Sequence, residues 1–400
     1  MIVLALSPYT LYRHKVMSIK VISLAGIRTR FKTKIMIRSQ DLLLRTIGRK
    51  VPGFRLQSII QKFSKRFVSG YPYVIKLDVI DTCNLKCKMC YAKNSGQEVR
   101  FSNLLHILKQ IGNVPVRLDL LGGEPLLRED ICEVIEFAKS HTAIKEVVIY
   151  TNGTLATEKL ARELASVGLD KAIVTFISHN PQKHDSFTGV ADSWHKAVAG
   201  IKNFLKAGIK MYTFTALHSE NIMDLEDIQK FVRNQLKVTP LFYQYVPQSQ
   251  NDLLLISPEA WGNAKHKVLY KYSPEHFDYI QHIITFCGRI CLGGYYVISI
   301  KNDGTVNPCP FIYDIPLGNA FEQNIWDIFA SRYKSSKFCE FMSLPEECTS
   351  CTYKNLCGGG CKAGNKVLFG NYLKRDSRCF GPWSESISLR EMRDRLPTFF

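Results

Sequence analysis

The chain carries the sequence VIKLDVIDTCNLKCKMCY at residues 74–91. Its first part, Val74–Asp81, is mostly apolar and β-branched, which predicts a buried strand. Three cysteines follow at once, Cys83, Cys87 and Cys90, in the spacing CxxxCxxC. Three thiolates on one short loop can hold three irons of a cubane cluster and leave the fourth iron open to a small molecule. The alternative is a zinc loop that lacks one ligand.

The alternation of strand and helix continues beyond this loop, which predicts parallel βαβ units. About six such units are too few for a closed barrel of eight, so an α/β fold with a partial (β/α)6 TIM-like barrel is expected, its ligands at the carboxyl ends of the strands. The further predicted strands are Val116–Leu121, Glu146–Tyr150, Lys171–Ile177, Lys210–Thr215 and Leu241–Val246. The predicted helices are Leu104–Ile111, Glu129–His141, Glu158–Val167, Trp194–Ala207 and Asp224–Gln235.

Composition divides the 400 residues into five segments. Residues 1–70 hold fifteen Lys and Arg and one acid, Asp41, so this extension supplies +14 of the net charge of +18. The barrel is expected over 71–257, a helical linker over 258–286, a small Cys-rich domain over 287–383 and a C-terminal helix over 384–400. Because the body of the chain is nearly neutral, no nucleic-acid partner is expected.

The end of the basic extension predicts an amphipathic helix, because apolar residues recur at helical spacing between lysines and an arginine. Residues 40–68 could contact an anionic membrane surface, or the apolar stripe could pack on the body. The chain shows no secretory signal and no apolar run long enough to span a bilayer. Its 13 cysteines in a chain of this length favour metal-bound thiols in a reducing, cytoplasmic setting, with peripheral membrane contact as the alternative.

The CxxxCxxC loop after the first strand resembles the signature of the radical S-adenosylmethionine superfamily. In that family the open iron binds the amino and carboxylate groups of S-adenosylmethionine, whose reductive cleavage yields a 5′-deoxyadenosyl radical that abstracts a hydrogen atom. The resemblance implies a 4Fe–4S cluster held by Cys83, Cys87 and Cys90, and an electron donor such as flavodoxin or ferredoxin. Met89 departs from the family, which often has an aromatic residue before the third cysteine.

Further residues at predicted strand ends extend this resemblance. Gly122-Gly123-Glu124-Pro125 is similar to the family's GGEP motif, in which glycines let the backbone approach the methionine amino group and the acid complements its charge. Asn152 and Ser178 follow the third and fourth strands and are the other expected cofactor contacts. Taken alone, each of these sequences is also typical of an ordinary turn.

The C-terminal cysteines resemble the SPASM domain, whose motif is CX9–15GX4C, CX2CX5CX3C and a final cysteine. Relatives with this domain often hold two auxiliary 4Fe–4S clusters, with Cys287 as the eighth ligand here. Motif order implies one set of Cys287, Cys291, Cys309 and Cys361, and a second set of Cys348, Cys351, Cys357 and Cys379. A pair of zinc sites is the alternative. Since this segment has little apolar periodicity, bound metal is expected to hold it together.

The resemblance predicts an enzyme but leaves its substrate open. The first hypothesis is a peptide or protein maturase. The alternative is radical oxidation or decarboxylation of a small molecule, such as a sugar, a lipid-linked intermediate or a tetrapyrrole. Sulfatase maturation is disfavoured, because Pro310 stands where those relatives have an aspartate after the cysteine. A non-enzymatic zinc scaffold or nucleic-acid binder is the third hypothesis.

Overall fold

The computed structural model describes residues 71–92, 96–257, 260, 291–351, 354 and 358–379. The basic extension over 1–70, with its membrane hypothesis for 40–68, lies outside the described residues. So do the C-terminal helix predicted over 384–400 and nearly all of the linker predicted over 258–286. Within the described residues, no helix is both long enough and apolar enough to cross a bilayer.

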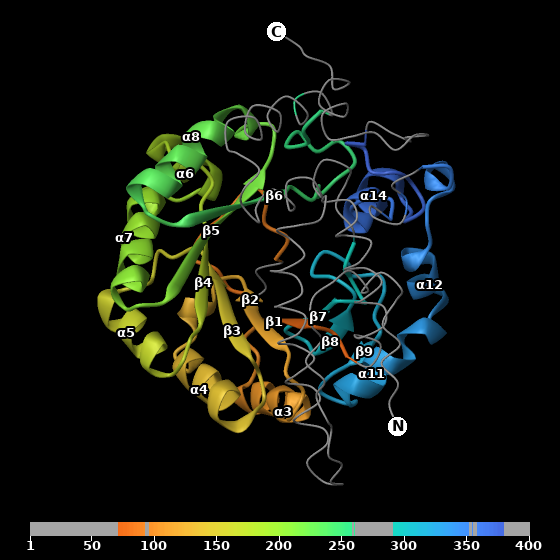
Figure 1. Cartoon of the computed structure of the whole chain (residues 1–400), viewed down its shortest axis with the longest axis horizontal. Helices are drawn as coiled ribbons and strands as arrows, with labels where there is room; N and C mark the ends of the chain where they lie inside the picture. Colours follow the sequence, from red (N-terminus) through yellow and green to blue (C-terminus); the bar gives the residue numbers. More distant parts are fainter. Residues whose placement is uncertain are drawn as a thin grey trace, which may run out of the picture.

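A single curved sheet of nine strands organises the described chain, in the order β6-β5-β4-β3-β2-β1-β7-β8-β9. Strands β1 to β6 run parallel to their neighbours, which confirms the predicted βαβ units. The helices between them lie along the outer side of the curve (Figure 1). The six strands are β1 Val74–Ile80, β2 Arg117–Gly122, β3 Glu146–Thr151, β4 Lys171–Thr175, β5 Lys210–Leu217 and β6 Thr239–Gln244.

The outer helices follow the predicted positions closely. Side-chain caps fix several of their starts, as where Thr157 accepts a hydrogen bond from the Leu160 amide. Gly189 ends α6 in the left-handed conformation that favours glycine. The helices are α3 Phe101–Ile111, α4 Ile131–His141, α5 Glu158–Ser166, α6 Pro181–Thr188, α7 Ser193–Lys206 and α8 Leu225–Lys230, which continues as a π-helical turn over Phe231–Gln235.

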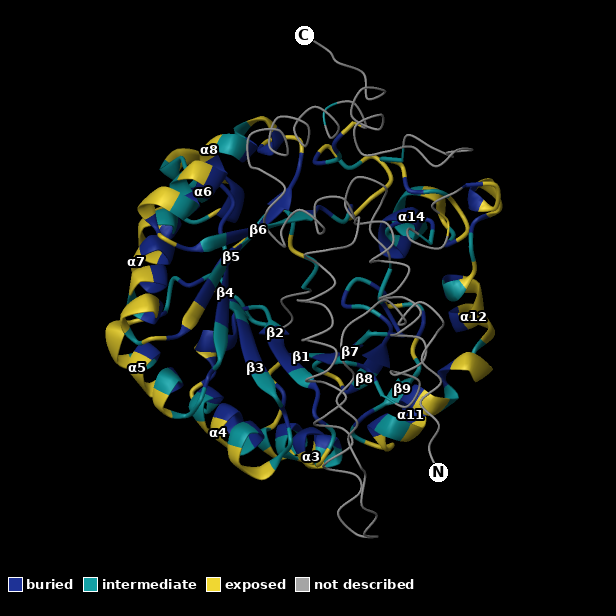
Figure 2. Ribbon diagram, in the orientation of Figure 1, coloured by how far each residue is buried: buried dark blue, intermediate teal, exposed yellow. Residues whose placement is uncertain are grey.

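The two faces of the barrel strands differ in chemistry because side chains alternate along a strand. In β1, Ile75, Leu77 and Val79 are fully buried in the main hydrophobic core, which also includes the inner faces of the helices. Lys76 and Asp78 alternate with them and therefore lie on the opposite, interior face. Figure 2 shows the buried strands and the exposed outer helix surfaces.

The C-terminal segment extends the same sheet. Strand β7 (Val297–Ile300) pairs in parallel with β1, and β8 (Thr305–Asn307) and β9 (Gly318–Asn319) continue antiparallel. Ile298, Ile300 and Phe329 belong to the main core. The expectation that metal alone holds this segment together is therefore corrected, because strand pairing and apolar packing contribute directly. Its helices are α11 Ile325–Ser331, α12 Ser336–Met342 and α14 Lys362–Phe369.

Candidate functional site

The three-cysteine loop begins directly after β1, at the carboxyl end of the barrel strands. The Cys83 sulfur accepts a hydrogen bond of 3.4 Å from the Leu85 amide. Burial first, and then the nearby Cys90 and Cys83 thiolates, raise the pKa of Cys87 to about 12. The three sulfur atoms therefore lie close enough for the charge of one thiolate to raise the pKa of another. Three thiolates that repel one another in this way are suited to surround a positively charged metal cluster.

Gly122 and Gly123 pack against the chain that leads into this loop. A Cβ atom on Gly122 would stand 2.0 Å from the Ile80 carbonyl oxygen, and one on Gly123 would stand 2.1 Å from that of Thr82. Two backbone hydrogen bonds join the segments, from the Gly123 amide to Ile80 and from the Glu124 amide to Thr82, each 2.8 Å long. Only glycine permits this contact, so the GGEP motif fixes where the cysteine loop starts.

The carboxylate of Glu124, an expected cofactor contact, accepts hydrogen bonds from the protein itself. Its side chain is fully buried. One carboxylate oxygen accepts hydrogen bonds from the Thr151 hydroxyl at 2.5 Å and the Leu126 amide at 3.0 Å, and the other accepts from the Asn152 amide at 2.7 Å. Burial raises the pKa of Glu124 to about 7 against these hydrogen bonds. The carboxylate therefore joins the ends of β2 and β3 and presents no exposed charge to a ligand.

Asn152 connects the end of β3 to the cysteine loop. The nitrogen of its side-chain amide lies 3.9 Å from the Cys83 sulfur and donates a 2.8 Å hydrogen bond to the side-chain oxygen of Asn84. Asn84 in turn donates to the Thr154 hydroxyl at 2.8 Å. The structure thus brings Asn152 to the first cysteine, where its amide can donate a hydrogen bond to a thiolate.

Ser178 and Pro125 are engaged in local turns. Ser178 is buried, its hydroxyl accepts from the Asn180 amide at 3.1 Å, and its carbonyl accepts from the Trp194 indole at 3.2 Å. These contacts stabilise the connection from β4 to α6. Pro125 starts the short 3-10 helix Pro125–Leu127, where its missing N–H costs nothing.

The C-terminal thiols fall into two groups, and within each group the charge of one thiolate raises the pKa of another. Burial, then Cys291 and Cys361, raise the pKa of Cys309 to about 12. Burial, then Cys379 and Cys351, raise the pKa of Cys348 to about 11. Cys287 and Cys357 lie outside the described residues, so each group shows three thiols. In the described part of the chain, no three His, Cys, Asp or Glu side chains lie close enough together to bind a single metal ion. The cysteine ligands of a 4Fe–4S cluster lie farther apart, because the cluster is larger than one ion.

Asp376 holds these two groups of thiols next to each other. Its carboxylate accepts a 2.9 Å hydrogen bond from the Cys361 amide, and its carbonyl accepts a 3.0 Å hydrogen bond from the Cys379 amide. A bidentate contact from Arg378, 2.8 Å to each carboxylate oxygen, compensates the buried charge. Cys361 and Cys379 belong to different groups, so Asp376 contacts both.

Sequence reasoning missed two buried cations beside the first cysteine loop. Arg128 donates to the carbonyls of Val79 and Val99, each at 2.8 Å. Lys301 pairs with Asp78 at 3.0 Å inside the protein. No local pattern marks either residue as buried, because the carbonyl partners of Arg128 and the carboxylate partner of Lys301 come from distant parts of the chain.

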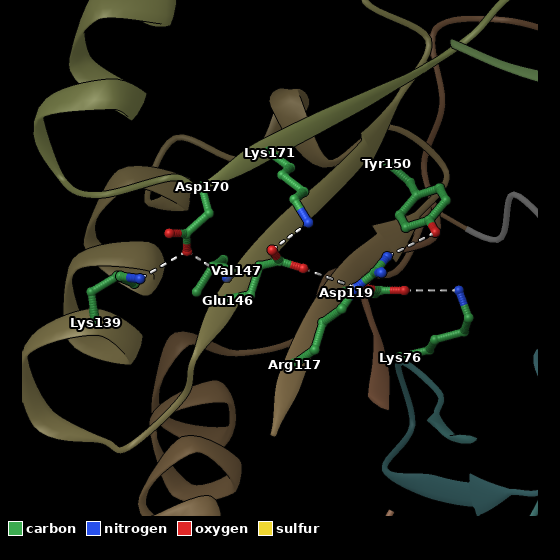
Figure 3. Close-up of polar contacts among 9 residues, drawn as sticks. All are labelled: Lys76, Arg117, Asp119, Lys139, Glu146, Val147, Tyr150, Asp170 and Lys171. Atoms are coloured by element: carbon green, nitrogen blue, oxygen red, sulfur yellow. Dashed lines mark hydrogen bonds and ion pairs between the residues drawn. The ribbon is translucent and has the colours of Figure 1, made fainter. Parts of the chain in front are cut away.

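A charged cluster lies on the interior face of the barrel strands (Figure 3). The buried Asp119 carboxylate accepts from Lys76 at 3.0 Å and from Arg117 at 2.5 Å. Arg117 also donates to the Tyr150 hydroxyl at 3.2 Å. Arg117 also pairs with Glu146 at 3.8 Å, and Glu146 pairs with Lys171. Three cations therefore face two carboxylates, which leaves an excess of one positive charge in the cluster. The Lys76 charge also reaches Cys309, whose pKa it lowers against the effect of burial and the other thiols.

Comparison with known families agrees with this geometry. Residues 77–232 match the radical SAM superfamily, and residues 291–352 match the iron–sulfur cluster-binding SPASM domain. The chain is a radical SAM enzyme with a C-terminal SPASM domain. The two domains indicate 4Fe–4S clusters and S-adenosylmethionine as cofactors of this radical SAM enzyme.

Individual relatives of the radical SAM enzyme differ in what they act on. An AdoMet-dependent heme synthase of Methanosarcina barkeri is 24% identical, over 78% of this chain and 97% of that protein. The antilisterial bacteriocin subtilosin biosynthesis protein AlbA of Bacillus subtilis is also 24% identical, over 80% of this chain and 73% of that protein. A solved structure of anSMEcpe with bound AdoMet aligns with a TM-score of 0.64 and 20% identity, covering 77% of this chain and 94% of that one. The structural likeness shows the shared fold.

Proposed function

We propose that this enzyme reductively cleaves S-adenosylmethionine at a 4Fe–4S cluster held by Cys83, Cys87 and Cys90. The observation that supports the proposal is the position of this three-cysteine loop, directly after β1 and within the residues that match the radical SAM superfamily. When bound, the cluster and S-adenosylmethionine supply a 5′-deoxyadenosyl radical that abstracts a substrate hydrogen atom. The protein's own contribution is to fix the loop and to orient the cofactor.

The residues around the loop divide that task. Gly122 and Gly123 set the start of the loop, because only glycine lets this turn pack against the carbonyls of Ile80 and Thr82. Asn152 donates toward Cys83, which would stabilise a thiolate ligand there. Glu124 is a positioning residue that keeps the Asn152 backbone in place. Ser178 remains a proposed cofactor contact only if the β4–α6 turn rearranges on binding, because its hydroxyl is engaged locally.

Loss of one thiol tests the assignment of the loop. Anaerobic Cys87→Ala protein, reduced with dithionite and supplied with S-adenosylmethionine, is expected to form no 5′-deoxyadenosine. Cys132→Ala is the matched control, because Cys132 lies on α4 outside the three thiol groups, and its product formation should equal that of the wild type. Persistent 5′-deoxyadenosine from Cys87→Ala would show that another site performs the cleavage.

We also propose that the C-terminal thiols hold two auxiliary 4Fe–4S clusters. The groups Cys291, Cys309, Cys361 and Cys348, Cys351, Cys379 support the two ligand sets, which Cys287 and Cys357 would complete. A full complement corresponds to about twelve irons per chain. Zinc without iron in anaerobically purified protein would instead support the scaffold hypothesis.

For the substrate we propose a small organic molecule that carries carboxylates. Lys76 and Arg117 lie on the interior face below the cysteine loop and both pair with Asp119. Glu146 pairs with Arg117 and with Lys171, so three cations face two carboxylates there. With a rise of about 3.3 Å per residue, Lys76 lies about 13 Å from Ile80 along β1, so a bound molecule of about that length would reach from the cysteine loop to the cations. The heme synthase relative, which aligns over nearly its full length, favours a tetrapyrrole.

A peptide substrate is the second candidate. The subtilosin biosynthesis protein AlbA aligns with most of this chain, which favours ribosomally made peptides. A peptide with acidic side chains could use the same interior cations. In both candidates the carboxylate would bind to the same cations. The candidates differ in the rest of the substrate, which is a tetrapyrrole in one case and a peptide in the other.

A substrate panel separates the candidates. We expect an iron tetrapyrrole with free carboxylates to accelerate 5′-deoxyadenosine formation at least tenfold, and its carboxylate methyl esters to have little effect, because esters carry no charge for Lys76 and Arg117. Arg117→Gln should weaken the response to the free acid selectively, while Arg162→Gln on the exposed face of α5 should not. Equal acceleration by acid and ester would contradict the role of the cations, and a response only to acidic peptides would establish the peptide candidate.

A further inference from the structure

Lys301 occupies a buried position between the barrel and the C-terminal segment. It follows β7 directly, and its side chain is only 7% exposed. The Lys301 ammonium pairs at 3.0 Å with Asp78 on the neighbouring strand β1, whose side chain is 10% exposed. Burial makes an unpaired charge at either position costly, so each group compensates the charge of the other where β1 and β7 pack together.

The same ammonium contacts both cysteine segments. It donates a 2.7 Å hydrogen bond to the carbonyl of Pro310, the residue that follows Cys309. It also lies 5.0 Å from the ring centroid of Tyr91, the residue that follows Cys90. One side chain therefore touches the immediate neighbour of a cysteine in each segment.

Two tyrosines complete this junction. Lys301 lies 4.6 Å from the ring centroid of Tyr313, whose hydroxyl donates a 3.1 Å hydrogen bond to the Tyr91 carbonyl. The Tyr91 ring also packs on Phe311, with 4.7 Å between centroids. Aromatic rings attract a cation over their faces, and the attraction grows when water is excluded. The ammonium is thus enclosed by groups that belong alternately to the two segments.

We propose that Lys301 is a positioning residue that fixes the Cys90 loop and the Cys309 segment relative to each other. Its ammonium pairs with Asp78 on β1. Its other contacts are with Tyr91 in the Cys90 loop and with Pro310 in the Cys309 segment. Without the ammonium, the Pro310 carbonyl and the Tyr91 ring lose their common partner, and the two segments can move independently. The distance between the two proposed clusters would then vary, a consequence that rests on the proposed function.

Hydrogen–deuterium exchange of the full-length protein tests the junction directly. The decisive variant is Asp78→Asn/Lys301→Met, because it removes both charges and leaves no buried ion without its partner. We expect the amides of 84–92 and of 308–313 to exchange at least tenfold faster than in the wild type, while the strands β2–β5 keep their protection. The control is Lys374→Met, which removes an exposed pair with Glu347 and should leave both segments unchanged.

A second measurement reports relative position and not stability. Pulsed electron paramagnetic resonance on the reduced protein measures the distance distribution between the centres at the two segments. We expect this distribution to be at least twice as wide in the double variant. The proposal would be overturned if residues 84–92 and 308–313 of the double variant exchanged at the wild-type rate, or if only one of these segments exchanged faster. An unchanged distance distribution in the double variant would also overturn it. Iron content reports separately on the cysteine assignments, so a failure there is distinguishable from a failure of the junction.

Discussion

Glu124 illustrates how a single side chain can hold a functional loop in place. Its two carboxylate oxygens accept from the ends of β2 and β3, and the adjoining Gly123 contacts the segment before Cys83. Three hydrogen bonds stabilise the ionised form, yet burial outweighs them and raises the pKa to about 7. Burial of this carboxylate is unfavourable, but its hydrogen bonds give the start of the cysteine loop a defined geometry.

This raised pKa predicts a pH dependence of stability. The folded-state pKa of about 7 lies above the usual value of 4.5, so the folded protein binds more protons than the unfolded chain between these pH values. The stabilisation from Glu124 is complete below about pH 4.5 and is lost as the pH rises through 7. We expect the free energy of unfolding of the wild type, relative to Glu124→Gln, to fall by about 2–3 kcal/mol between pH 5 and 8.

Urea denaturation of both proteins across this pH range measures the difference. Glu158→Gln, on the exposed face of α5, serves as the control, and its difference from the wild type should stay constant with pH. A constant difference for Glu124→Gln as well would mean that the carboxyl group is not destabilised by burial.

At the scale of elements, Arg128 connects several segments that carry no regular hydrogen-bond ladder between them. Its guanidinium donates to the carbonyl at the end of β1 and to that of Val99 before α3, and pairs with Asp130 at the start of α4. Glu98 adds a second ion pair at 3.0 Å. The side chain is 1% exposed, so its five donors replace water for these groups.

Replacement of Arg128 is therefore expected to be costly. Arg128→Met leaves the carbonyls of Val79 and Val99 without this donor and the Asp130 carboxylate without its partner. We expect a loss of about 3–5 kcal/mol in the free energy of unfolding, against less than about 0.5 kcal/mol for the exposed Arg162→Met on α5. Chemical denaturation compares the two variants, and equal effects would show that Arg128 is only a surface residue in solution.

The sequence predicted those features that depend on local pattern. Apolar alternation located the six barrel strands, and the spacing of Cys83, Cys87 and Cys90 located the loop that the structure places after β1. The contact of Glu124 with the cofactor stays a prediction. The burial of its carboxylate between β2 and β3 could not be predicted, since a motif names the residue but not the direction of its carboxylate. Arg128 and Lys301 could not be predicted, because isolated cations are usually solvated and only the fold buries them.

At the scale of the whole molecule, the barrel and the C-terminal segment share one sheet and one core. Leu77 of β1, Ile300 of β7 and Phe329 of α11 belong to the same hydrophobic cluster. Sequence composition separated the two regions because β7–β9 are short and cysteines dominate their surroundings. Pairing between strands far apart in sequence leaves no local signal, so the continuity of the sheet could not be predicted.

The pairing of β7 with β1 has a consequence for biosynthesis. Asp78 and Lys301 are 223 positions apart in the chain. At about 5–20 residues per second, the ribosome needs about 11–45 s to make the intervening polypeptide. During that interval the edge of β1 that will receive β7 has no strand partner, and nascent β1 is exposed to wrong edge-to-edge pairing with other chains. We therefore expect newly made chains to aggregate less when a chaperone covers this edge until β7 emerges.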